Sequence, residues 1–143
     1  MLPEFTSEGE LPAGVHLANW QEFQARFGAG TPRRSWLFRR FQALVELAAS
    51  KRRRIFVWGS FLTTKPVPRD VATLLIMDED LEVERVPVPA QVLFDSIHSK
   101  LLFESDVFWA RASIGEEVLQ LWLDTYQTSR NFGKRGIVEL ELR

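Results

Sequence analysis

The chain has 143 residues, of which 45% are hydrophobic and 26% are charged, and it contains no cysteine. This length and balance are typical of a single globular domain, and they exclude collagen-like, low-complexity and disordered classes. The absence of cysteine removes disulfides and thiolate metal ligands, and it favours a cytoplasmic protein. No stretch of about 18 residues is free of charge, so we expect no transmembrane helix.

The charges nearly cancel. The chain has 18 lysines and arginines and 19 aspartates and glutamates, which gives a formal net charge of −1. This balance argues against nucleic acid as a partner of the whole surface, although a local basic patch keeps that partner open. Aromatic residues make up 12% of the chain and are expected in the core. Trp20 and Trp109 are the two that we consider as base-stacking surfaces.

Residues 1–16 contain two prolines and two glycines and predict an extended arm, which leaves 17–143 as one domain. Asn19 stands three residues before Glu22, the spacing of a capping box, and predicts a short helix. Thr31 and Pro32 predict the cap and first residue of a longer helix that runs to about residue 50.

Four consecutive basic residues, 51–54, follow that predicted helix directly. The favoured interpretation is a solvated helix end, where cations complement the helix dipole, and the alternative is a nucleic-acid contact.

Further along the chain, short β-prone or alternating runs predict strands, and helical spacing predicts two more helices. Residues 81–89 are left open between an edge strand and a loop. The predicted strands are 55–58, 71–77, 104–112 and 137–142, and the predicted helices are 89–102 and one opened by a capping box at Ser113 and Glu116. The order predicts an α+β or α/β protein with a small mixed sheet, of which α+β is favoured.

One group of residues suggests chemistry. A strand ends in Gly59 and Ser60, nine residues intervene before Asp70 opens the next strand, and Asp106 lies on a third. Glycine allows a phosphate to approach the backbone closely, and carboxylates on neighbouring strands can share a hard cation. To bring Ser60, Asp70 and Asp106 together, the three strands must be neighbours in one sheet with the helix from residue 32 packed on its face.

This layout resembles the DNA polymerase β-like nucleotidyltransferase superfamily, and more closely an uncharacterised family of small microbial nucleotidyltransferase-like proteins. The superfamily signature is a Gly-Ser pair, a spacer, a pair of carboxylates two residues apart, and a later carboxylate on a strand. The segments that carry the closer resemblance are LPAGVH (11–16), WQEFQARFG (20–28), WGSFLTTKPVPRD (58–70), SDVFW (105–109) and TSRNFGKRGIVEL (128–140).

The resemblance implies a nucleotidyltransferase-like sheet that binds a nucleoside triphosphate with Mg²⁺. In an active relative, Asp70 and Asp106 are the metal ligands and catalytic carboxylates, and Asp106 activates the acceptor hydroxyl. The expected nucleotide-binding residues are Gly59, Ser60, Lys65, Arg130 and Lys134.

Each of these residues also has an ordinary structural interpretation. Gly59 and Ser60 can form a simple turn, Asp70 can cap a strand, and Asp106 can face solvent. Basic loop residues are most often solvated.

The chain departs from the superfamily pattern two residues after Asp70, where the second carboxylate is replaced by Ala72. Asp78 and Asp80 are too far along the chain to replace it and are expected in a turn. We therefore expect nucleotidyl transfer to be weakened or lost. The alternative is a catalytically silent binding or regulatory module with a protein partner, and the resemblance suggests a defence or toxin–antitoxin system as its context.

Overall fold

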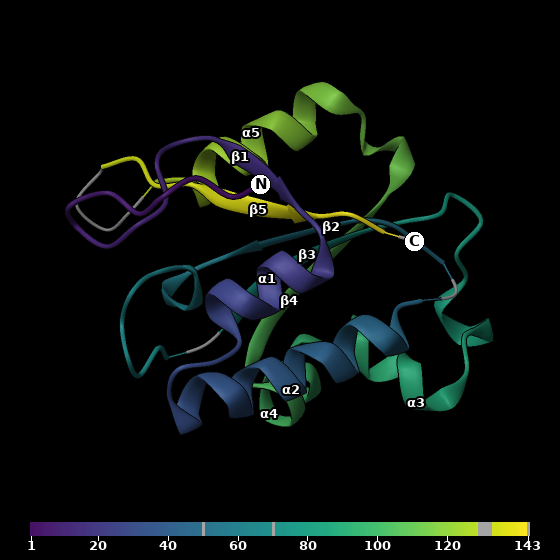
Figure 1. Ribbon diagram of the computed structural model, residues 1–143. Coiled ribbons are helices and arrows are strands. Elements are labelled where there is room, and N and C mark those ends of the chain that lie inside the picture. The colour runs from purple at the N-terminus through teal and green to yellow at the C-terminus, as the bar shows by residue number, and fades with distance from the viewer. Residues whose placement is uncertain (50, 70, 129–132, 143) are drawn as a thin grey trace.

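The computed structural model describes residues 1–49, 51–69, 71–128 and 133–142 (Figure 1). Five strands form one sheet in the order β1-β5-β2-β3-β4. The strands are β1 Val15–Ala18, β2 Arg52–Trp58, β3 Val71–Met77, β4 Ser105–Arg111 and β5 Ile137–Leu140. The α-helices of the described residues are α1 Trp20–Phe27, α2 Pro32–Leu47, α3 Val88–Gln91, α4 Ser96–Phe103 and α5 Glu116–Tyr126.

The sheet is mixed. Strand β2 runs antiparallel to both of its neighbours, β3 and β5, whereas β1 pairs with β5 and β4 with β3 in parallel. The predicted α+β class is confirmed, and the three strands that carry the candidate residues, β2, β3 and β4, are neighbours as expected. In the described part of the chain, no helix is both long and apolar enough to span a bilayer.

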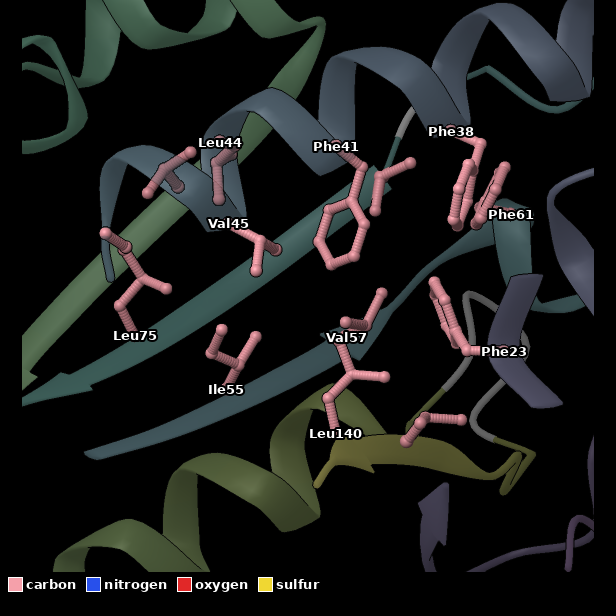
Figure 2. Close-up of a cluster of buried hydrophobic side chains, with 14 of the residues drawn as sticks. Phe23, Phe38, Phe41, Leu44, Val45, Ile55, Val57, Phe61, Leu75 and Leu140 are labelled. Atoms are coloured by element: carbon pink, nitrogen blue, oxygen red, sulfur yellow. The ribbon is translucent and has the colours of Figure 1, made fainter. Parts of the chain in front are cut away.

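Helices cover both faces of the sheet, with α1, α2 and α4 on one side and α5 on the other (Figure 1). The face under α2 holds the larger core, in which phenylalanines of α1 and α2 pack on aliphatic side chains of the strands (Figure 2). The face under α5 holds a second cluster, made of Phe56, Trp58, Ala72, Leu74, Ile76, Leu119, Leu123 and Ile137. Because alternate strand residues point to opposite faces, Trp58, Ala72 and Asp106 share the α5 face.

The predicted caps at Asn19 and Thr31 are confirmed. The Asn19 side chain accepts from the Glu22 N–H at 2.8 Å, and the Glu22 carboxylate accepts from the Asn19 N–H at 3.4 Å. Thr31 caps α2 by accepting from the Arg34 N–H at 3.2 Å, with Pro32 as the first helical residue.

The predicted helix end at residues 51–54 is wrong, because α2 ends at Leu47 and Arg52 already begins β2. The Arg54 guanidinium bonds the Glu139 carboxylate of β5 at 2.8 Å and that of Glu116 at 3.1 Å. The Glu139 hydrogen bond raises the pKa of Arg54. These partners are 85 and 62 residues away in sequence, so the pattern of basic residues alone could not indicate a strand.

The predicted continuous helix over 89–102 is also wrong. Helix α3 ends at Gln91, and α4 begins at Ser96, after Asp95 caps it by accepting from the N–H groups of Ile97 and His98 at 3.1 Å. The break rotates the second part, so that Leu93 is buried whereas Ile97 is 70% exposed.

Two further local predictions need correction. The Ser113 capping box is absent: Ala112–Ile114 form a 3₁₀ turn, Gly115 precedes α5 with φ of 85°, and the Ser113 N–H donates to Glu79 instead. Residues 83–85, left open between strand and loop, form a 3₁₀ turn. Strand β1, which has only four residues, is not among the predicted strands.

The residues before β1 pack against the domain. Leu2 and Leu11 are 5% and 1% exposed and belong to the larger core. Strand β1 spans the predicted boundary between residues 16 and 17, and the division into arm and domain stays a prediction.

Candidate functional site

The candidate residues that the structure describes lie at one end of the sheet, where β2 ends and its neighbours begin. Trp58, the last residue of β2, pairs with Ala72, and Ala72 pairs in turn with Asp106 of β4. The turn at Gly59 and Ser60 therefore follows directly on a row that crosses three strands. Two predicted site residues, Asp70 and Arg130, lie outside the described residues.

Gly59 has the backbone conformation that the turn requires. Its φ of 103° and ψ of −170° lie in a region that is essentially restricted to glycine. The chain then makes a 3₁₀ turn over Ser60–Leu62, closed by a hydrogen bond from the Leu62 N–H to the Gly59 carbonyl at 3.1 Å. A side chain at position 59 would strain this turn, which explains why glycine precedes Ser60.

The hydroxyl of Ser60 is held in a defined position. Its Oγ accepts from the Arg69 N–H at 3.1 Å, and the Ser60 carbonyl accepts from the Thr63 hydroxyl at 2.7 Å. A hydroxyl has one proton to donate as well as lone pairs to accept. The Arg69 N–H occupies only a lone pair of Ser60 Oγ, so among the described residues the Ser60 proton is left for an acceptor such as a phosphate oxygen.

The loop of residues 61–69 is fixed by a buried arginine. The Arg34 side chain is 5% exposed and donates to the carbonyls of Phe61 at 2.8 Å, Lys65 at 2.7 Å, and Thr63. It also bonds the Phe27 carbonyl at 3.2 Å. Burial lowers the pKa of Arg34, but a guanidinium keeps its charge in proteins.

Two neighbours of Arg34 complete this attachment. Arg33 donates to the carbonyls of Pro68 at 3.0 Å and of Arg69, and the Thr31 hydroxyl donates to the Pro66 carbonyl at 2.6 Å. Sequence reasoning missed this role. A signal was present, because arginines in the first turn of a helix oppose its dipole and no acidic residue balances them there.

Three exposed cations lie in the loops at this end. Lys65 and Arg69 are exposed on the loop after Ser60, and within the described residues neither side chain forms an ion pair. Lys134 lies just before β5, whose Val138 pairs with Val57, and its ammonium donates to the Thr128 hydroxyl at 3.0 Å. The described part of this end is therefore suited to an anion.

Asp106 already has a cationic partner. Its carboxylate lies 3.3 Å from the Lys100 ammonium of α4, and the two side chains are 49% and 42% exposed. Beside it, Ala72 contributes a methyl group that is 8% exposed. Two-metal transfer chemistry needs carboxylates shared between the ions, so the described residues here do not fit a two-metal centre. Across the described ranges no group of three or more His, Asp or Glu side chains is arranged so that it could hold a metal ion.

Aromatic rings cover the same row of residues. The Trp58 ring stacks on Tyr126 of α5 with centroids 3.7 Å apart and planes at 10°. Phe108, two residues after Asp106 and on the same face, lies 5.9 Å from Trp58 at 21°. Of the two residues considered as base-stacking surfaces, Trp20 packs on Phe38 and Phe41 in the larger core. Trp109 also packs against this core, with its ring edge-on to Phe94 at 5.0 Å.

Two cavities bear on the choice of site. A cavity of about 490 Å³ lies at the other end of the sheet and is lined by Lys51, Asp80, Leu81, Glu82, Arg85, Val86 and Pro87. Its charged groups are already paired, Lys51 with Asp80 at 3.0 Å and Arg85 with Glu82 at 2.6 Å. The second, of about 320 Å³, lies against Phe108 and Tyr126. The smaller cavity is the one that adjoins the candidate residues.

The fold and this end of the sheet define an α+β protein with a mixed sheet and a Gly-Ser turn in a basic loop. Residues 3–141 match the model of DUF6932, a family of unknown function, and the chain belongs to this family. Comparisons with curated proteins and with solved structures gave no match.

Proposed function

We propose that the protein is a nucleoside triphosphate-binding module of nucleotidyltransferase-like architecture in which nucleotidyl transfer is weakened or lost. The observation that carries the proposal is the row of Trp58, Ala72 and Asp106 across three strands. This row puts the Gly-Ser turn, the position of the replaced carboxylate and the later strand carboxylate at one end of the sheet.

The binding part of the proposal rests on the loop after β2. The Ser60 hydroxyl has a proton to donate, and Lys65 and Arg69 are exposed cations without an ion pair in the described chain. Hydrogen bonds between a cation and a phosphate are about twice as strong as neutral ones. Because Arg33 and Arg34 hold the loop by its carbonyls, the loop backbone is in place before a ligand arrives, and the ordering cost of binding falls on the two exposed side chains.

The loss of transfer rests on Ala72 and on the partner of Asp106. A carboxylate that activates an acceptor hydroxyl must accept its proton, and the Asp106 carboxylate is already engaged by the Lys100 ammonium at 3.3 Å. The methyl group of Ala72 can neither hold a cation nor take a proton. Mg²⁺ binding by Asp70 and Asp106 stays a prediction, since Asp70 is outside the described residues.

Isothermal titration with ATP, GTP, CTP and UTP, each in Mg²⁺ and in EDTA, tests the proposal. We expect at least one nucleotide to bind with one-to-one stoichiometry in both conditions. Lys65→Ala should weaken that binding by roughly tenfold, as expected for the loss of one hydrogen bond to a charged group.

Lys51→Ala is the matched control, because Lys51 is a lysine at the opposite end of the sheet, paired with Asp80. It should leave the dissociation constant unchanged. Absence of binding for all four nucleotides, or equal weakening by the two lysine variants, would contradict the proposed function.

A further inference from the structure

We propose that Phe108, Trp122 and Tyr126 form a stacking subsite for the base of the bound nucleotide. This inference rests on the proposed function and deepens it, because it assigns the part of the ligand that the Gly-Ser turn does not contact. The rings of Phe108 and Tyr126 lie 6.3 Å apart at 26°, and both line the cavity of about 320 Å³ together with Trp122.

The subsite adjoins the predicted phosphate turn through Trp58. Trp58 directly precedes Gly59, and its ring stacks on Tyr126 from the side of the sheet. Phe108 follows Asp106 by two residues on the same face of β4, so it belongs to the end of the sheet where the candidate residues meet. Phe94, Val107 and Trp109, which belong to the larger core, also line the cavity, so it lies at the free edge of β4. A base held there against Phe108 and Tyr126 would lie next to Trp58, the residue that leads into the predicted phosphate turn.

The rings are exposed enough to receive a ligand. Phe108 is 48% exposed, although it is a large apolar side chain, while Trp122 and Tyr126 are half-buried. A cavity of this volume is at the small end of the range for ligand sites, and aromatic walls are typical of such sites. A planar ring stacked on Phe108 would cover apolar surface that is now open to water.

The walls also carry polar groups without a protein partner. Within the described residues, neither the indole N–H of Trp122 nor the hydroxyl of Tyr126 makes a hydrogen bond. Burial raises the pKa of Tyr126, so its hydroxyl remains a neutral donor at physiological pH. These groups suit the ring nitrogens and exocyclic oxygens of a nucleobase, and a purely apolar ligand would leave them unused.

The test compares two probes by isothermal titration: ATP and inorganic triphosphate. Stacking predicts that the wild type binds ATP more tightly than triphosphate. Phe108→Ala should weaken ATP binding by roughly 5- to 150-fold, the range for loss of one base–aromatic stack, while triphosphate binding stays the same. Phe108→Leu separates stacking from general apolar contact and should lose most of the same affinity.

Leu121→Ala is the matched control, since Leu121 is an apolar residue of α5 that is 66% exposed and does not line the cavity. It should leave ATP binding unchanged. Circular dichroism of each variant confirms that the fold is retained.

The outcomes separate this inference from the function on which it rests. If triphosphate binds and ATP binds no more tightly, or if Phe108→Ala leaves ATP affinity unchanged, the stacking subsite is wrong and the phosphate site stands. If neither triphosphate nor any of the four nucleotides binds the wild type, both are wrong. If Phe108→Ala changes only the oligomeric state, the exposed ring belongs to a protein contact, and the inference is overturned.

Discussion

Replacing Arg34 by methionine is expected to lower the free energy of unfolding by at least about 3 kcal/mol, because a buried hydrogen-bonding group left without its partner costs about 1–3 kcal/mol. Arg34 is 5% exposed, and its guanidinium donates hydrogen bonds to the carbonyls of Phe27, Phe61, Thr63 and Lys65. Methionine fills much of the same volume but donates nothing. Denaturation in urea, followed by far-ultraviolet circular dichroism, measures the change.

Arg39→Met is the control, since Arg39 is exposed on the same helix, and it should change the free energy of unfolding by less than about 0.5 kcal/mol. Arg34→Lys keeps the charge but cannot reach all four carbonyls, so we expect an intermediate loss. It also keeps the prediction testable if Arg34→Met does not fold. A stability within about 1 kcal/mol of wild type for Arg34→Met would show that the loop does not depend on this side chain.

Restoring the missing carboxylate with Ala72→Asp should make the protein less stable in EDTA and more responsive to Mg²⁺. Ala72 is 8% exposed among aromatic and aliphatic side chains, and an unpaired polar group there costs at least about 2 kcal/mol. The loss should grow as the pH rises above about 3.9, the ordinary pKa of aspartate, because burial raises the pKa of the folded carboxyl above the unfolded value.

Magnesium should offset part of this loss if the introduced carboxylate and Asp106 can share an ion. Thermal melts in EDTA and in millimolar Mg²⁺ should then show a larger metal-induced rise in Tm for Ala72→Asp than for wild type. Ala110→Asp adds a carboxylate to the same face of the sheet at the far end of β4, and Mg²⁺ should not favour it. Equal metal-induced shifts for wild type and Ala72→Asp would show that position 72 does not face a cation site.

Local signals allowed much of the fold to be predicted. The caps at Asn19 and Thr31 act within three residues of themselves, and apolar runs such as 71–77 leave few alternatives to a buried strand. The predictions that were wrong depended on distant partners. The basic residues 51–54 indicate a helix end, because nothing near them shows that Arg54 pairs with Glu139 across the sheet.

In the candidate site, too, some features could be predicted from the sequence and others could not. The Gly-Ser turn and the row with Ala72 and Asp106 follow from strand order, and the sequence motif indicated that order. The attachment of the loop by Arg34 and the pairing of Lys100 with Asp106 could not be predicted, because each depends on how a helix packs beside the sheet. The stacking of Trp58 on Tyr126 could not be predicted either, because these residues are 68 positions apart in the chain.

Nuclear magnetic resonance titration with ATP tests the central claim most directly, because it locates the ligand on the structure without assuming a reaction. With backbone amides assigned, we predict saturable shifts at Gly59, Ser60 and Asp106, in Mg²⁺ and in EDTA alike. The amides of Lys51 and Val86, which line the larger cavity at the other end of the sheet, should not move. Saturable shifts confined to that cavity, or none at Gly59 and Ser60, would contradict a nucleotide site at the end of β2.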